Sequence, residues 1–181
     1  MRKNILWITE TAVMLALLVA LQVITKPLGQ LVTGSFVNAV LVVTVLVAGL
    51  SSGITVALVS PVLAYLLGIA PQVLTVPAIM VGNCVFVMLL YFIAGKDSKK
   101  IIRQILAWLI AAAAKFAALY AIVVWVICGV LAERLLASGM MKAPMLKVLT
   151  ATFSWPQLFT ALIGGAVALL IVPLLRKALP R

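Results

Sequence analysis

Histidine is absent from this sequence, and acidic residues are scarce. The 181 residues include no histidine and three acids, Glu10, Asp97 and Glu133, which lie far apart along the chain. Membrane-embedded enzymes need clustered acids, histidines or a metal site for acid–base chemistry. A carrier driven by protons or sodium needs a buried carboxylate near the bilayer midplane. The sequence therefore argues against catalytic residues, a metal site and ion-coupled transport.

Cysteines and nucleotide-binding motifs are equally sparse. The two cysteines, Cys84 and Cys128, lie inside apolar runs without the spacing of metal ligands, and we interpret them as small core residues. No Walker-type glycine-rich loop with a lysine occurs, so we expect no nucleotide hydrolysis by that route. No cofactor is expected. Any energy that the function requires must come from another protein.

Apolar residues are what the sequence has in abundance. Hydrophobic residues make up 66% of the chain and charged residues 9%, and the mean hydropathy is +1.34. These values predict an integral membrane protein. The formal charge of +11 does not indicate nucleic acid as a partner, because most bases lie at the ends of apolar runs, where they orient spans and contact lipid. The opening apolar run has no small-residue cleavage site after it, so we expect a retained first helix.

Glycine, proline and charge divide the chain into six apolar runs. We predict an all-α integral membrane protein in which residues 1–181 form a single membrane domain with six transmembrane helices. The second and third runs are shorter than a span usually is. The predicted spans are about 6–25, 34–49, 53–68, 72–94, 101–132 and 152–175.

The basic residues predict the orientation of these spans. Six spans place both termini on one side, and that side would carry nine Lys and Arg residues against four on the other. The excess predicts cytoplasmic termini and a multi-pass protein of the plasma membrane. The nine are Arg2, Lys3, Lys96, Lys99, Lys100, Arg103, Arg176, Lys177 and Arg181, and the four are Lys26, Arg134, Lys142 and Lys147.

Lys115 is the fourteenth base and lies inside the fifth run, "LIAAAAKFAALYAIVVW". It is about 12 residues into that helix, roughly 18 Å deep and near the bilayer midplane. A lysine there costs about 2.5–3.5 kcal/mol on insertion scales, and no acid is expected at its depth. Three solutions are open: snorkelling, a polar cavity with backbone carbonyls and water or a neutralised amine, or an anionic ligand. The last makes Lys115 a candidate substrate-binding residue.

Three further residues are candidates for substrate binding. Asn83 is about as deep as Lys115 and needs hydrogen-bond partners, from a ligand or from another helix. Trp155 and Gln157, in "FSWPQ", offer a stacking face and an amide at the start of the sixth run, although Trp155 also suits an interfacial aromatic belt. Asn38 is expected at an outer helix end as a cap or a solvated group. The outward loops are rich in Gly, Pro, Ser and Thr, so we expect the pocket at the outer end.

Ala12, Ala16 and Ala20 form a stripe of small residues on the first run, "AVMLALLVA". Such a stripe lets another helix approach closely, either within the chain or from a partner. With the chain length, six spans and a short second span, this stripe resembles the substrate-binding S components of energy-coupling-factor (ECF) vitamin transporters. The resemblance extends over the whole chain in layout.

The resemblance implies a bacterial vitamin importer. S components bind a vitamin-like molecule near the outer surface, in a pocket of outer loops and the last three helices, and they lack ATPase activity. It implies that a membrane-embedded coupling subunit docks on Ala12, Ala16 and Ala20, and that two cytoplasmic ATPases drive release inwards. An anionic substrate such as nicotinate, pantothenate, lipoate or biotin would pair with the positive charge of Lys115. Two alternatives are a structural protein of the bacterial shape-determining type and a small autonomous carrier.

Overall fold

The computed structural model describes residues 2–70, 72–95 and 100–178. Within these ranges the chain consists of helices and short turns, without strands. Lys96, Asp97, Lys99 and Arg181, and the side chains of Arg2 and Lys3, lie outside the description. The elements are α1 (Arg2–Thr25), η1 (Lys26–Leu28), α2 (Gln30–Val43), η2 (Thr44–Ala48), α3 (Leu50–Leu66), α4 (Thr75–Ala94), α5 (Ile101–Leu119), η3 (Tyr120–Val130), α6 (Ala132–Ala137), α7 (Ala143–Thr152) and α8 (Trp155–Ala178).

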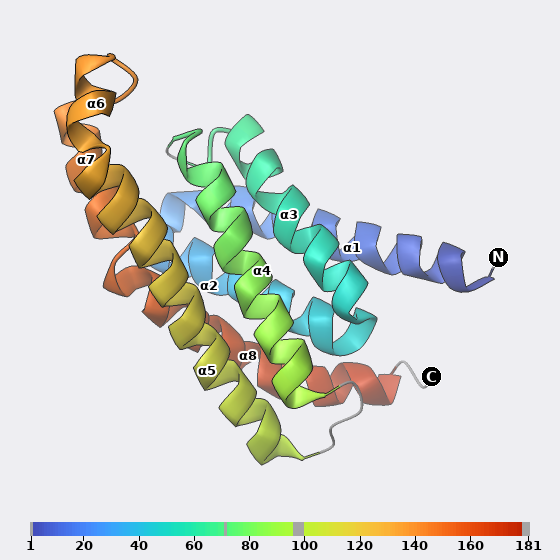
Figure 1. The fold of residues 1–181 in the computed structure, drawn as a ribbon. Coiled ribbons are helices and arrows are strands. Elements are labelled where there is room, and N and C mark those ends of the chain that lie inside the picture. The colour runs from blue at the N-terminus through green and yellow to red at the C-terminus, as the bar shows by residue number, and fades with distance from the viewer. Residues whose placement is uncertain (1, 71, 96–99, 179–181) are drawn as a thin grey trace.

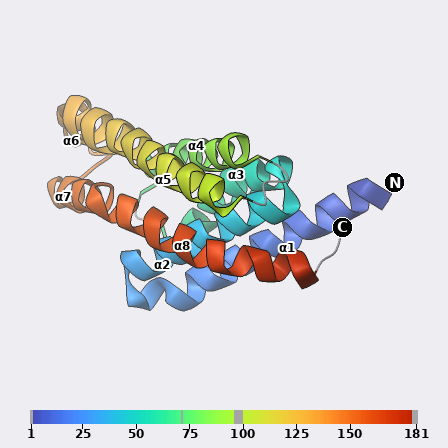
Figure 2. The same cartoon turned by 90° about the horizontal axis from the view of Figure 1, so that it is seen from below.

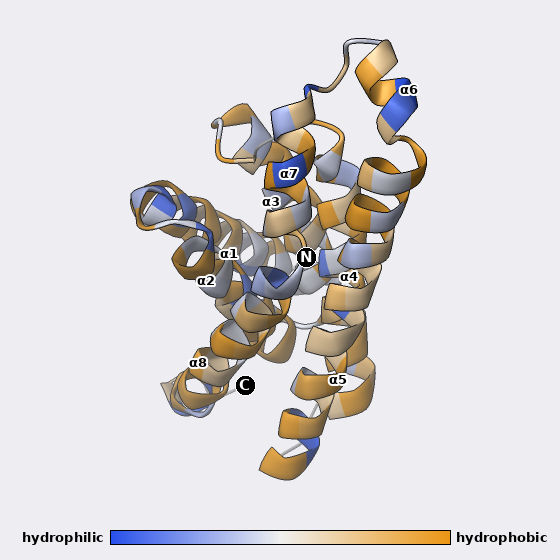
Figure 3. Ribbon diagram, turned by 90° about the vertical axis from the view of Figure 1, so that its left-hand side faces the viewer, coloured by the Kyte–Doolittle hydropathy of each residue, from blue (hydrophilic) through white to orange (hydrophobic). Residues whose placement is uncertain are grey.

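Five helices in the described ranges are long and apolar enough to cross a membrane: 4–28, 30–48, 75–94, 101–130 and 143–178. Each of the six predicted runs coincides with a helix, and α3, with 17 residues, is the short one. The second helix begins at Gln30 rather than at residue 34, because Gly29 (φ 88°) makes the turn that starts it. Figure 3 shows apolar residues over most of these helices.

The chain between the fifth and sixth runs is more ordered than expected. The sequence predicted a long loop there, but α6 and α7 occupy most of it. Both are short, and Leu149 is the one buried residue that they contribute. α6 lies at the end of the molecule farthest from the closing turns of α8 (Figure 1). Helices that bury so few residues show no clear apolar stripe in the sequence, and this is why α6 and α7 were not predicted.

Close helix contacts at glycine hold the bundle together. α2 packs along α8, α4 packs between α3 and α5, and α1 packs on α2 and α3; Figure 2 shows α4 and α5 on one side of the molecule and α1 and α2 on the other. Gly164 of α8 faces the α2 backbone, and a methyl group there would meet the Asn38 Cβ at 2.7 Å. Small residues allow such approach where lipid offers no hydrophobic drive between helices.

Candidate functional site

A cavity of about 90 Å³ lies at the end of the bundle opposite to the start of α1 and the end of α8. This is the end that the sequence predicted to face outwards. The cavity draws residues from every α-helix except α6, and not from the last three spans alone. Those that carry polar side chains are Gln22, Gln30, Thr33, Asn38, Ser60, Asn83, Lys115, Thr152 and Gln157.

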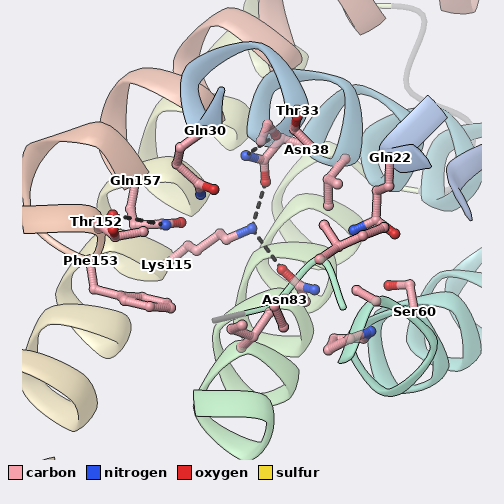
Figure 4. Close-up of a pocket in the computed structure, with 17 residues that line it drawn as sticks. Gln22, Gln30, Thr33, Asn38, Ser60, Asn83, Lys115, Thr152, Phe153 and Gln157 are labelled. Carbon is pink, nitrogen blue, oxygen red and sulfur yellow. Dashed lines mark hydrogen bonds between the residues drawn. The ribbon is translucent and has the colours of Figure 1, made fainter. Parts of the chain in front are cut away.

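Lys115 stands at the centre of this cavity (Figure 4). Its side chain is 3% exposed, and its Nζ donates to Asn38 Oδ1 at 2.6 Å and to Asn83 Oδ1 at 2.7 Å. The ammonium also lies 5.3 Å from the centre of the Phe86 ring, within cation–π range. One lysine on α5 thus connects α2 and α4.

The chemistry of lysine determines how both amides are turned. An ammonium donates and cannot accept, so Asn38 and Asn83 both present their oxygens to it. The Asn38 amide nitrogen donates to the Gly34 carbonyl at 2.9 Å and to Thr160 Oγ1 at 3.2 Å. Asn38 is therefore held by α2 and α8, and it positions Lys115.

No carboxylate neutralises Lys115: within the described ranges its polar partners are the two amide oxygens. Amide oxygens solvate an ammonium but leave its full charge in place, and an uncompensated buried charge is costly. In the same part of the chain no group of acids, histidines or cysteines is placed to hold a metal ion. The site can therefore attract an anion, and its described lining carries no carboxylate or imidazole.

The structure brings together three of the four predicted substrate-binding residues. Lys115, Asn83 and Gln157 line the cavity, and Gln157 Nε2 donates to the Thr152 carbonyl at 3.2 Å. Trp155 does not line it, so the structure does not bring this residue together with the other three. Its side chain is 63% exposed and stacks on Phe116 with ring centres 5.6 Å apart, because the first turn of α8 points it away from the bundle axis.

Asn38 belongs to the cavity although the sequence did not predict it there. It was expected to cap a helix or to face water, but it is 1% exposed and bonded to Lys115. Gln22 and Ser60, also buried and lining the cavity, were not predicted. The signal that could have found all three is a polar residue inside an apolar run, the same signal that identified Asn83 and Lys115.

Ala12, Ala16 and Ala20 all lie on the exposed side of α1. The buried side of the same helix carries Thr11, Leu18, Gln22 and Thr25. The stripe therefore does not serve packing within the chain, which was one of its two interpretations. It faces whatever surrounds the protein in the membrane.

Comparison with known proteins adds one finding. A family model described as the substrate-specific component of the ECF transporters matches residues 8–176. No curated protein and no solved structure matches the chain.

Proposed function

Since the chain belongs to the substrate-specific components of the ECF transporters, we propose that its cavity captures a small anionic, vitamin-like molecule. Membership makes it a non-catalytic, substrate-binding subunit of an importer, a multi-pass protein of a prokaryotic plasma membrane that works with an ECF module. The observation that carries the proposal is Lys115, whose buried side chain has no carboxylate partner in the part of the chain that the structure describes.

An anionic ligand would supply the opposite charge that the described part of the fold does not place beside Lys115. A carboxylate or phosphate at Lys115 would form a charge-assisted hydrogen bond with a buried side chain, where such bonds are stronger than in bulk water. Asn83 and Gln157 add amides beside it. A cationic substrate would meet an ammonium and find no acidic side chain among the residues that line the cavity.

The arrangement of helices supports a complete topology. We propose six spans, with α3 as the short one, and both termini in the cytoplasm, since the nine bases assigned inwards lie at the start of the chain, around the segment between α4 and α5, and at the end of the chain. The cavity then opens outwards, as capture from outside requires. Two partner ATPases would supply the energy through a membrane-embedded coupling subunit.

The first test is to identify what the protein carries when purified. Mass spectrometry of small molecules released from the detergent-solubilised protein is expected to find a carboxylate or phosphate compound in stoichiometric amount. A protein that is empty, and stays empty after soaking with a panel of acidic micronutrients, would contradict the proposal. It would favour the structural alternative.

The exposed alanine stripe is the proposed docking face for the coupling subunit. Ala16→Leu places a bulky side chain at its centre and should keep a partner helix from approaching closely. We expect ATP-driven uptake by the reconstituted complex to fall roughly 10-fold or more, at a cost of about 1.4 kcal/mol or more in docking, with substrate binding by the isolated subunit unchanged. Ala113→Leu makes the same change at an exposed position of α5 and should leave uptake intact. Equal uptake by both variants would remove the stripe from the interface.

A further inference from the structure

Two buried polar atoms in the described part of the chain have no hydrogen-bond partner: Asn83 Nδ2 and Gln22 Oε1. Both residues line the same cavity. Buried polar groups are almost always paired, and the rare exceptions require an explanation. Two exceptions from different helices that meet in one cavity are explained together by a ligand that bonds to both.

The first of these atoms extends the anion site. Asn83 gives its oxygen to Lys115, so its amide nitrogen is turned away from the ammonium. Lys115 has three N–H donors and uses two of them on amides. The third N–H and the Asn83 amide nitrogen are two donors from neighbouring side chains, an arrangement that suits the two oxygens of one carboxylate.

Gln22 supplies a second polar group with the opposite character. It comes from α1, is 7% exposed and brings an unpaired oxygen, which can only accept a hydrogen bond. Ser60 of α3, 1% exposed, lies beside it in Figure 4, on the side of Lys115 away from Gln157. We call the Gln22 oxygen the acceptor end of the cavity; the Ser60 hydroxyl beside it can donate or accept. A ligand group with an N–H or O–H would satisfy the Gln22 oxygen.

We propose that the substrate is a small acid with two polar ends: a carboxylate bound by Lys115 and Asn83, and a neutral N–H or O–H group that donates to Gln22 Oε1. This inference rests on the proposed function, because it assigns the remainder of the same substrate. A simple fatty acid has nothing to donate at Gln22, so we expect it to bind more weakly than an acid with such a donor.

Matched benzoates test the two ends separately. Calorimetry would compare 3- and 4-aminobenzoate with 3- and 4-methylbenzoate, in which a methyl group of similar size replaces the amine, and with uncharged 4-aminobenzamide. We expect one aminobenzoate to bind about 5- to 100-fold more tightly than its methyl partner. Leaving a buried acceptor without a hydrogen bond weakens binding by about this factor. In Gln22→Leu the preference should disappear. In Gln72→Leu, a glutamine outside the cavity that bonds to the Met140 carbonyl, it should persist.

The outcomes separate the two proposals. Binding of amino- and methylbenzoates with equal affinity, lost in Lys115→Met, would overturn the acceptor end and leave the anion site standing. Failure of every benzoate to bind at millimolar concentration, or binding of the benzamide as tight as that of the acid, would count against an anion site and so against the proposed function. An amine preference that survives in Gln22→Leu would also overturn the role of Gln22.

Discussion

Lys115→Met is expected to lower the affinity for a carboxylate or phosphate ligand by about 100-fold or more. Removing one partner of a buried charge pair costs about 3–5 kcal/mol, which corresponds to at least this change in the dissociation constant. Methionine keeps the length of the side chain but leaves the oxygens of Asn38 and Asn83 without their donor. The measurement is calorimetric titration with the compound that mass spectrometry identifies.

A matched variant distinguishes this effect from a general loss of charge. Lys147→Met removes an exposed lysine at the same end of the bundle and should bind as tightly as the unmodified protein. Size-exclusion chromatography shows whether Lys115→Met remains a folded monodisperse species. If a folded Lys115→Met protein binds with unchanged affinity, the ammonium does not touch the substrate and serves the packing of α2, α4 and α5 instead.

Gly164→Ala is expected to destabilise the whole bundle and the site together. The added methyl group would lie 2.7 Å from the Asn38 Cβ and 2.8 Å from the Ala39 backbone nitrogen, closer than such atoms can approach. The backbones of α2 and α8 must separate, and overpacking of this kind costs about 1–3 kcal/mol or more. The apparent melting temperature should fall by roughly 3–10 °C. Binding should weaken as well, because Asn38 moves with α2 and takes Lys115 with it.

Gly129→Ala provides the comparison. A methyl group there meets its nearest neighbour, the Val124 carbonyl oxygen, at 3.5 Å, which is ordinary contact. Its melting temperature and affinity should match those of the unmodified protein. A Gly164→Ala protein that melts at the unmodified temperature would mean that α2 and α8 yield easily, and that Asn38 is held less firmly than its bonds to Gly34 and Thr160 indicate.

Membrane helices were predictable from this sequence because lipid imposes one strong requirement, a long apolar run with its backbone satisfied internally. All six runs correspond to helices. The errors lie where that requirement does not act: at the start of α2, which follows Gly29 and not residue 33, and in α6 and α7, which expose most of their residues. Short helices of that kind depend on contacts that no local pattern encodes.

The site was predictable only in part, for a related reason. Depth along a helix follows from counting residues, and it placed Lys115 and Asn83 together correctly. The direction in which a side chain points also depends on how its helix is rotated in the bundle. This rotation leaves Trp155 exposed and Gln22 in the lining of the cavity. Asn38 was lost through a four-residue error in one boundary, which moved it from the middle of a helix to its end.

The bonding around Lys115 also determines how this protein will respond to engineering. An ammonium without a carboxylate and two unpaired amide atoms are liabilities in a folded chain that has no ligand. Libraries screened only for heat resistance will therefore enrich apolar replacements at Gln22 and combined apolar replacements at Lys115, Asn38 and Asn83, because a single change at Lys115 leaves two amide oxygens without their donor. We expect such variants to lose substrate binding, so any thermostabilised form of this subunit should be screened with its substrate present.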